Sequence, residues 1–402
     1  MRPLNLYLAG TASWFVNHGI QGVMFAWLVT IVLRESPQMV GIAQMALLLP
    51  ALLFMLIGGS LADRFGGRRV AVLAQAFSVV PVLGLLVVLA ADQLSFAIMI
   101  GFAVLMGLAQ AFVTPARDGL LNQVAEGRIQ HTVVRATMIQ FSAMLIAFVI
   151  VGQTDRVGPA PVIGVQALVL ILGTVAMRRI PVAAPARRPS DSAFWRDLSA
   201  SVAAGLVTVM RSAPMRMVAI QNVAIGMFFM GSYIVTIPVA VRDMYGGSAA
   251  DLAMLNAANA FGLALTSFLL MRVGHVRRPR RALLLAQALG AVALGTAGFG
   301  FDFPVFAACI FLWGGCGGVA MSMARTIMQE QAPYDQRGRV MAFFSFSLMG
   351  AGPFGALLAG AMAGWWGPGN ALIAAMCGML TVLGTLAVAS RGSAEGVSDL
   401  GR

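Results

Sequence analysis

Charged residues are scarce in this sequence. Only 10% of its 402 residues are Asp, Glu, Lys or Arg, whereas 59% are apolar and the mean hydropathy is +0.86. A water-soluble domain carries about 25% charged residues, so the composition excludes a soluble protein and, with it, a soluble nucleic-acid-binding domain. Lys is absent altogether, so the 27 basic residues are all Arg.

Cysteine is also rare. Cys309, Cys316 and Cys377 lie in apolar runs, with no CxxC pair and no neighbouring His cluster, so we predict neither disulfides nor a zinc site. Paired carboxylates, a nucleophile beside a base and a phosphate-binding loop are missing as well. The sequence therefore predicts no catalytic residue, no metal and no cofactor, and a protein that is not an enzyme.

Long apolar runs dominate what is present. A bilayer core about 30 Å thick needs about 20 apolar residues in helical form, and twelve segments meet that length. The first lacks a small-residue cleavage site, so we expect a retained helix and not a signal peptide. The segments are 6–33, 38–60, 70–91, 94–115, 133–153, 158–177, 214–241, 248–270, 282–301, 303–323, 340–363 and 369–389.

The Arg residues predict the orientation of these segments. With a cytoplasmic N-terminus, all Arg but Arg34, Arg156 and Arg242 fall on the cytoplasmic side, as the positive-inside rule requires. We therefore expect a multi-pass protein with both termini in the cytoplasm.

A polar stretch divides the chain into two halves. We predict a six-helix bundle at 1–179, a cytoplasmic linker at 180–212, a second six-helix bundle at 213–390 and a cytoplasmic tail at 391–402. The linker contains three Pro residues and an apolar pattern of helical period from Phe194 to Val209, which suits a helix lying on the membrane surface.

The two halves also resemble each other in sequence. Residues 68–76 (RRVAVLAQA) match residues 280–288 (RRALLLAQA), and two further matches follow in the same order. They pair Ala116, Arg117 and Gln123 with Ala324, Arg325 and Gln331, and 29–31 with 235–237. Chance agreement in an apolar sequence is the alternative, but the first two matches are in polar positions. Parallel repeats with a substrate site between them are one transporter architecture.

A motif after the second segment names a family. Residues 59–69 read GSLADRFGGRR, which resembles the signature of the major facilitator superfamily with Gly67 in place of one basic residue. The resemblance implies an all-α membrane protein of twelve transmembrane helices in two pseudo-symmetric six-helix bundles. Residues 114–121 and 329–341 further resemble the branch that contains enterobactin and macrolide exporters. Two features of drug antiporters are missing: a Gly-Pro element in the fifth segment, and an Arg within 101–110 of the fourth.

By the same resemblance, the motif forms a conformational latch on the cytoplasmic side. In it, Asp63 with Arg68 or Arg69, together with Asp118 at the foot of the fourth segment, would hold that side shut; the alternative is a plain hydrophilic turn. The glycines suit a tight turn between two helices. The latch residues are Gly59, Asp63, Arg64, Gly66, Arg68, Arg69 and Asp118.

Ionisable side chains in the membrane usually mark function, and we find no Asp, Glu or Arg deep in a predicted segment. His18 is the lone titratable group there. It shares a helix face with Asn17 and Gln21, and because imidazole titrates near neutral pH we take it as the candidate for proton coupling. The alternative is a His that bonds to a neighbouring helix. Asp251, at the start of the eighth segment, is expected to cap that helix.

In the superfamily, the first, fourth, seventh and tenth helices line the cavity. That resemblance selects as substrate-binding residues Asn17, His18, Gln21, Gln110, Asn222, Tyr233 and Trp313. Amides in lipid more often join helices, which is the alternative for each of them. A cavity with aromatics and no fixed charge favours an amphipathic cargo that is neutral or weakly charged.

Taken together, these features predict a secondary transporter of the bacterial inner membrane. By resemblance it exports an amphipathic small molecule, such as a drug-like compound or a siderophore-like metabolite, by alternating access. Its partners are the lipid bilayer, the substrate and protons, with no nucleic acid, and we expect a monomer. The alternatives are an importer or facilitator of a neutral solute, and a membrane sensor or scaffold that does not transport.

Overall fold

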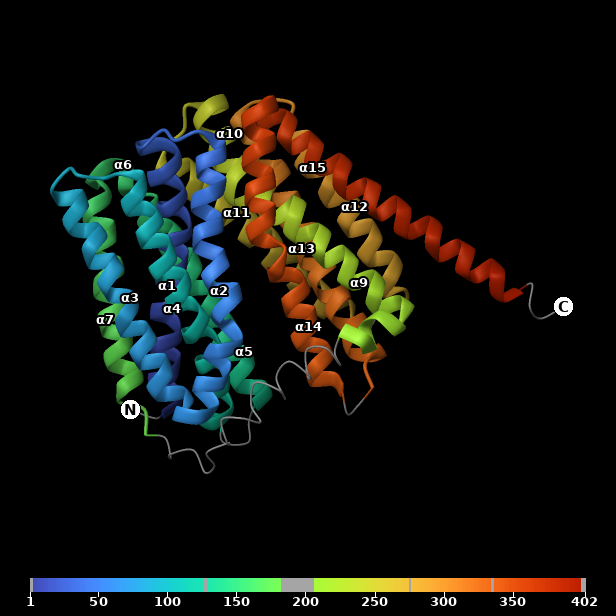
Figure 1. Cartoon of the computed structure of the whole chain (residues 1–402), viewed down its shortest axis with the longest axis horizontal. Coiled ribbons are helices and arrows are strands. Elements are labelled where there is room, and N and C mark those ends of the chain that lie inside the picture. Colours follow the sequence, from blue (N-terminus) through green and yellow to red (C-terminus); the bar gives the residue numbers. More distant parts are fainter. Residues whose placement is uncertain (1–2, 126–128, 182–205, 275, 334–335, 399–402) are drawn as a thin grey trace. The chain divides into compact units, whose positions relative to one another are not determined.

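The structure is a computed structural model that describes residues 3–125, 129–181, 206–274, 276–333 and 336–398 (Figure 1). Within these ranges the regular elements are helices and there is no strand. The predicted all-α fold class is therefore confirmed.

The first half consists of long helices joined by short turns. Its first helix ends in a π-helical turn, η1, before the chain reverses at 33–36. The elements are α1 (Pro3–Trp27), η1 (Leu28–Val32), α2 (Pro37–Phe65), α3 (Gly67–Ala90), α4 (Phe96–Val124), α5 (Ile129–Val151), α6 (Thr154–Val157) and α7 (Pro159–Arg178).

The second half begins with one helical stretch that contains two π-helical turns. Its last helix reverses at Gly367, where φ is 81°, a conformation that glycine adopts without strain. The elements are α9 (Ala213–Ala224), η2 (Ile225–Met230), η3 (Ser232–Thr236), α10 (Ile237–Tyr245), α11 (Ala249–Val273), α12 (Pro279–Ala297), α13 (Phe303–Gln331), α14 (Arg337–Gly350) and α15 (Gly352–Ser398).

Ten helical stretches in the described part of the chain are long and apolar enough to span a membrane. One of them, 339–388, has 50 residues, which exceeds the roughly 20 that a single crossing needs, and it folds back at Gly367. Helix α12 falls outside the ten but has 19 residues. Together they account for the twelve predicted segments, and the protein is a multi-pass membrane protein.

The fourth helix extends further than the sequence predicted. Helix α4 continues through Pro115 to Val124, whereas the predicted segment ends at residue 115. Pro50 and Pro81 also lie inside helices. Proline within membrane helices is tolerated because neighbouring groups satisfy the freed backbone carbonyls. The longer α4 places Arg117 and Asp118 within the helix, with consequences for the site below.

The described chain divides into two compact units. The first comprises residues 1–190 and 241–257, and the second comprises 191–240 and 258–402. The predicted domain boundaries stay a prediction. Most of the predicted linker, including Phe194, lies outside the described residues, but 206–211 are helical and Val209 is buried in the apolar core of the second unit.

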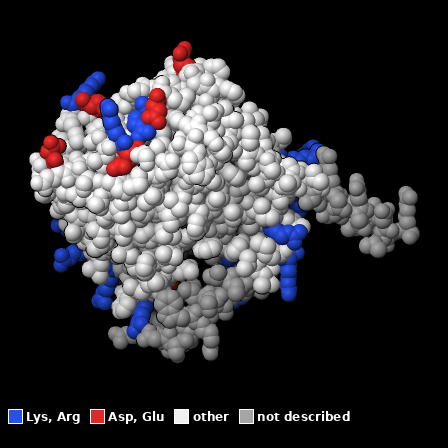
Figure 2. Space-filling model, turned by 45° about the horizontal axis from the view of Figure 1, so that its top comes forward, with Lys and Arg blue, Asp and Glu red and all other residues white. Residues whose placement is uncertain are grey.

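The outer faces of both units carry exposed apolar side chains. Leu73, Val87 and Val149 in the first unit and Leu285 and Leu289 in the second are more than 60% exposed. Figure 2 shows a wide uncharged surface, with charged side chains gathered towards its margins. Because water would not tolerate such a surface, it is the face that contacts lipid.

Candidate functional site

The second unit contains an apolar cavity of about 420 Å³, which we call the aromatic pocket. It is formed by one face each of the stretch 222–233, α11, α12, α13 and α14. Three of the predicted binding residues, Asn222, Tyr233 and Trp313, come together in it. Its wall includes Asn222, Phe229, Tyr233, Asn259, Gln287 and Trp313.

Trp313 is the centre of the aromatic cluster. Its ring stands edge-on to that of Phe229, with centroids 5.7 Å apart, and lies 5.9 Å from that of Tyr233. Only 7% of Trp313 is exposed. Such edge-to-face pairs are favourable arrangements of aromatic rings, so the cluster forms a rigid wall for an apolar ligand.

Asn222 is held in place at the edge of this pocket. Its Nδ2 atom donates hydrogen bonds to Ser347 Oγ at 3.1 Å and to the Phe344 carbonyl oxygen at 3.4 Å. The side chain thus joins α9 to α14, which is the interhelical role that amides commonly have in membranes. Its carbonyl oxygen is the part left to contact a ligand.

Gln287 was not among the predicted binding residues, yet it lines the aromatic pocket. It is 1% exposed, and neither its Nε2 nor its Oε1 atom has a hydrogen-bond partner. The sequence repeat pairs it with Gln75, whose Nε2 donates to Ser13 Oγ at 2.9 Å inside the first unit. A buried amide without a partner is costly, so Gln287 is available to bind a polar group of a ligand.

The first unit contains a cavity of different character, about 450 Å³ in volume, which we call the polar pocket. One face each of α1, α4 and α5 forms it. Two predicted binding residues, His18 and Gln110, line it, as does Asp118 of the predicted latch. Its wall includes Tyr7, His18, Gln110, Arg117, Asp118 and Gln140.

Arg117 lies further inside the structure than the sequence predicted, although it is near the end of its helix and not deep in a predicted segment. It is 6% exposed and sits in α4, inside the stretch Phe96–Leu121 that is long and apolar enough to cross a membrane. The predicted fourth segment ends at Pro115, which assigns Arg117 to a cytoplasmic loop. The repeat pairs Arg117 with Arg325 and so draws attention to Arg117. A sequence match does not show, however, whether a side chain is buried.

The remaining predicted binding residues, Asn17 and Gln21, do not line either pocket. Asn17 is fully buried, and its Oδ1 atom accepts a 2.8 Å hydrogen bond from Gln166 Nε2. This bond joins α1 to α7. Gln21 is 6% exposed on the same helix. Of the polar face predicted on α1, therefore, only His18 lines the polar pocket in this conformation, whereas Asn17 and Gln21 do not.

The latch residues form the turn between α2 and α3. Gly66 ends α2 with φ of 89°, and a Cβ on Gly67 would lie 2.7 Å from the Ala116 carbonyl oxygen, so a basic residue has no room there. Arg68 Nη1 donates a 2.7 Å hydrogen bond to the Ile180 carbonyl oxygen.

No ion pair of Asp63 with Arg68 or Arg69 is found among the described residues. Asp63 is exposed. Ala116 faces the start of α3, whereas Asp118, about 200° further round the helix, faces the polar pocket. The latch thus stays a prediction, for a conformation other than this one. A Cβ on Gly59 would lie 3.8 Å from Pro115 Cβ, and the Arg64 guanidinium carbon lies 5.3 Å from the centre of the Phe65 ring.

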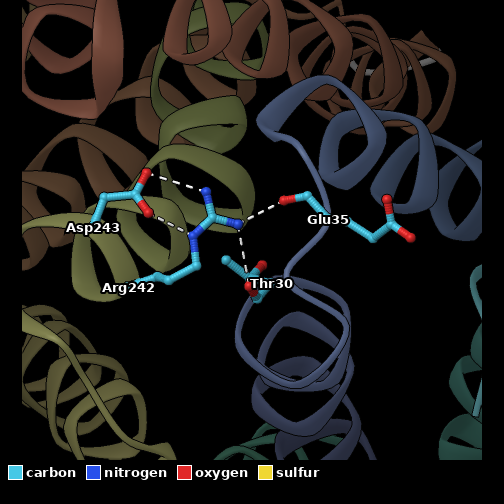
Figure 3. A network of polar contacts seen from close by, with 4 residues as sticks. All are labelled: Thr30, Glu35, Arg242 and Asp243. Carbon is cyan, nitrogen blue, oxygen red and sulfur yellow. Dashed lines mark hydrogen bonds and ion pairs between the residues drawn. The ribbon is translucent and has the colours of Figure 1, made fainter.

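A polar network at the opposite helix ends ties α10 and α11 to the first half of the chain (Figure 3). Arg242 donates to the carbonyl oxygens of Thr30 and Glu35 and pairs with Asp243. Asp155 accepts from the backbone N–H groups of Ala249 and Ala250 at the start of α11.

The start of α11 also corrects the prediction that Asp251 caps it directly. Ser248 is the N-cap residue, since its Oγ accepts from the Asp251 N–H at 3.1 Å. The Asp251 carboxylate in turn accepts from the Ser248 N–H at 2.9 Å. This reciprocal pair is a capping box.

Comparison with known proteins assigns the chain to a family. The family model described as a transmembrane secretion effector, within the major facilitator superfamily, matches residues 6–394. The chain is 26% identical to the multidrug efflux pump Tap of Mycolicibacterium fortuitum over 96% of its own length and 95% of that protein. It is 24% identical to the enterobactin exporter EntS of Shigella boydii over 82% of its length and 77% of that protein.

Solved structures show the same fold. An auto-inhibited POT family peptide transporter superposes with a TM-score of 0.75 at 14% identity, covering 97% of each chain. The nucleoside transporter NupG superposes with a TM-score of 0.74 at 11% identity, covering 96% of this chain and 99% of the other. With the family model spanning nearly the whole sequence, the protein belongs to the transmembrane secretion effector family of the major facilitator superfamily.

Proposed function

We propose that the protein exports an amphipathic small molecule across the bacterial inner membrane as a secondary transporter. The aromatic pocket carries this proposal, because it is an apolar chamber buried in a membrane-spanning unit with a few polar groups in its wall. Its volume lies within the range of about 300–1,000 Å³ typical of small-molecule sites. The similarity to a multidrug efflux pump and an enterobactin exporter supports the outward direction.

The chemistry of the pocket suits such a cargo. The rings of Phe229, Tyr233 and Trp313 offer flat apolar surfaces, and the amides of Gln287 and Asn222 offer hydrogen bonds. A ligand with an aromatic or aliphatic body and one or two polar groups satisfies both. As a transporter and not an enzyme, the protein binds this ligand without changing it chemically.

The predicted topology and coupling belong to the same proposal. Both termini lie in the cytoplasm, the two halves alternate in access as a monomer, and the residues of the α2–α3 turn with Asp118 form the latch of the other conformation. His18 is the proposed proton site, because it lines the polar pocket on α1 beside α4. If an uncoupler of the proton gradient left the efflux rate unchanged, proton coupling would be excluded.

The test is dye efflux from cells that express the protein. Cells loaded with N-phenyl-1-naphthylamine, ethidium or 1-anilinonaphthalene-8-sulfonate are energised, and the fall in fluorescence is followed. We expect faster efflux of at least one dye than in vector-only cells, and a loss of about tenfold for Trp313→Ala, which removes the wall of the pocket. Trp366→Ala is the matched control, because Trp366 is 55% exposed on α15.

Three outcomes separate the alternatives. Slower efflux in the wild type than in vector-only cells, with faster dye entry, would indicate an importer or facilitator. No difference for any dye, with normal amounts of protein in the membrane, would favour a sensor or scaffold. Equal losses for Trp313→Ala and Trp366→Ala would show that the aromatic pocket is not the binding site.

A further inference from the structure

We infer that the polar pocket binds the anionic group of an amphipathic ligand, with Arg117 as its counter-charge. The ligand class is an apolar body that carries a carboxylate, sulfonate or phosphate group. This inference rests on the proposed function and narrows its substrate class, since the uncharged cavity predicted from the sequence favours neutral or weakly charged cargo.

The pocket is built by three helices whose inward faces are polar. On α1, the residues Thr11, Phe15 and His18 follow at helical spacing, and on α4 Thr114 and Arg117 do the same. Positions three or four apart lie on one face of a helix. The site is therefore a concavity formed by packed helices of one structural unit and not a gap between loops.

Arg117 is the buried charge of this pocket. Its Nε atom has no hydrogen-bond partner, and no carboxylate of the described residues lies within ion-pair distance of it. The nearby Tyr7 hydroxyl donates to the Arg117 carbonyl oxygen at 3.4 Å and carries no charge. Asp118, next to Arg117 in the chain, lines the same pocket without forming an ion pair with it. A buried cation that lacks a direct ion-pair partner is unfavourable, so the pocket is poised to receive an anion.

The Arg117 guanidinium lies beside an aromatic ring. Its carbon lies 5.0 Å from the centre of the Phe15 ring, a cation–π arrangement. A guanidinium carries five N–H donors, and pairs of them match the oxygens of carboxylate, sulfonate and phosphate groups. The ring of Phe15 and the side chains of Trp14 and Leu121 add an apolar wall for the rest of the ligand.

Asp118 and His18 also face the pocket. Asp118 is exposed, whereas Arg117 is only 6% exposed. The Asp118 charge therefore offsets part of the Arg117 charge, but less than a carboxylate in direct ion-pair contact would. A proton on His18 would add a second positive charge and strengthen the attraction for an anion.

The test compares two dyes that share a ring system and differ in charge. The full-length protein is placed in nanodiscs of phosphatidylcholine, and binding of 1-anilinonaphthalene-8-sulfonate and of uncharged N-phenyl-1-naphthylamine is measured against empty discs. Arg117→Gln should weaken sulfonate binding about tenfold or more and change the affinity for the neutral dye by less than about twofold. Arg117→Lys keeps the charge and should lose less. Arg135→Gln, at an exposed Arg on α5, is the matched control.

A second readout separates binding from a structural role. Because Arg117→Gln removes a buried charge that lacks a direct ion-pair partner, its melting temperature without dye should equal or exceed that of the wild type. A lower melting temperature together with unchanged sulfonate affinity would overturn the inference. So would equal losses for both dyes, or equal losses for Arg117→Gln and Arg135→Gln.

The source of the anion is resolved by lipid composition. If phosphatidylglycerol in the disc competes with the sulfonate dye in the wild type but not in Arg117→Gln, the pocket accepts a lipid phosphate. If it does not compete, the anion is that of a soluble ligand. Binding in nanodiscs needs no transport, so a failure of the proposed export activity in cells would leave the measured role of Arg117 in anion binding unaffected.

Discussion

The guanidinium of Arg242, at the end of α10, donates a 2.6 Å hydrogen bond to the carbonyl oxygen of Glu35, in the turn between η1 and α2. The same Nη1 atom donates to the Thr30 carbonyl oxygen at 3.2 Å (Figure 3). The Thr30 carbonyl belongs to the last turn of a helix, where carbonyl groups lack partners within the helix, and the Glu35 carbonyl belongs to the turn that follows. Arg242 thus connects two segments that are more than 200 residues apart in the chain.

Removing this connection should destabilise the protein. Hydrogen bonds from a charged donor contribute about 1.5–3 kcal/mol when buried, and partial exposure of Arg242 lowers that figure. We expect Arg242→Ala to cost about 1–2 kcal/mol and to lower the melting temperature in detergent. Arg156→Ala, at an exposed Arg on the same side, serves as the control. Equal melting temperatures for the two variants would contradict a structural role for Arg242.

The start of α11 offers a second test of stability. Asp155 caps the first two N–H groups of α11, and its charge interacts favourably with the positive end of the helix dipole. Asp155→Asn keeps the shape and removes the charge, so it should cost about 0.5–1 kcal/mol. Ser248→Ala breaks the capping box and should cost about 1 kcal/mol. Thermal melting of the single and double variants checks both, and additive costs are expected because the two caps serve different N–H groups.

If instead the double variant melted no lower than either single one, the two caps would not be acting independently. Asp92→Asn is a suitable reference, because Asp92 follows the end of α3 but does not cap a helix in the described structure. Its substitution should leave the melting temperature within experimental error.

The sequence predicted the helices and their number because the bilayer requires long apolar runs. It failed at the C-terminal end of α4, where Pro115, Arg117 and Asp118 look like a loop. In the structure the helix continues, and the ring of Phe15 on α1 packs against the Arg117 side chain. That contact joins residues about 100 positions apart, so no local pattern reveals it.

Only part of the candidate site could be predicted, because its composition also depends on contacts between residues that are distant in the sequence. Asn222, Tyr233 and Trp313 do share one pocket, whereas Asn17 is engaged by Gln166 and Gln21 lines neither pocket. Amide side chains at similar depth in the membrane either join helices or face a cavity, and only their neighbours decide between the two. The repeat illustrates this, because Gln75 and Gln287 are matched and both buried, but Gln75 bonds to Ser13 on another helix whereas Gln287 lines the aromatic pocket.

This pair provides a matched prediction. Gln75→Leu loses the 2.9 Å hydrogen bond to Ser13 and leaves a buried hydroxyl with one partner fewer, so it should cost about 1–2 kcal/mol. Gln287→Leu removes an amide that has no partner and should leave the melting temperature unchanged or raise it. In dye efflux we expect the opposite ranking of the two variants. Gln287→Leu should slow the export of a hydrogen-bonding dye severalfold, whereas the folded fraction of Gln75→Leu should export it at the normal rate. A large loss of stability in Gln287→Leu would mean that its amide has a structural partner.

The close approach of the stretch 226–231, which comprises most of η2 and the residue after it, to α15 in the second unit allows a last test. A Cβ on Gly231 would overlap the carbonyl oxygen of Gly355, and one on Gly355 would overlap that of Gly226. Such small-residue contacts let membrane helices pack backbone to backbone. Gly355→Ala should therefore force the two stretches apart and lower the melting temperature, with a cost of about 1–3 kcal/mol. Gly384, in the part of α15 that follows the reversal at Gly367, has no atom within 4 Å of its would-be Cβ. Gly384→Ala should instead stabilise the helix by about 0.5–1 kcal/mol, because alanine has the better helix propensity. Opposite signs for the two substitutions, measured by melting in the same detergent, are the expected result; equal shifts would show that the packing at Gly355 does not limit stability.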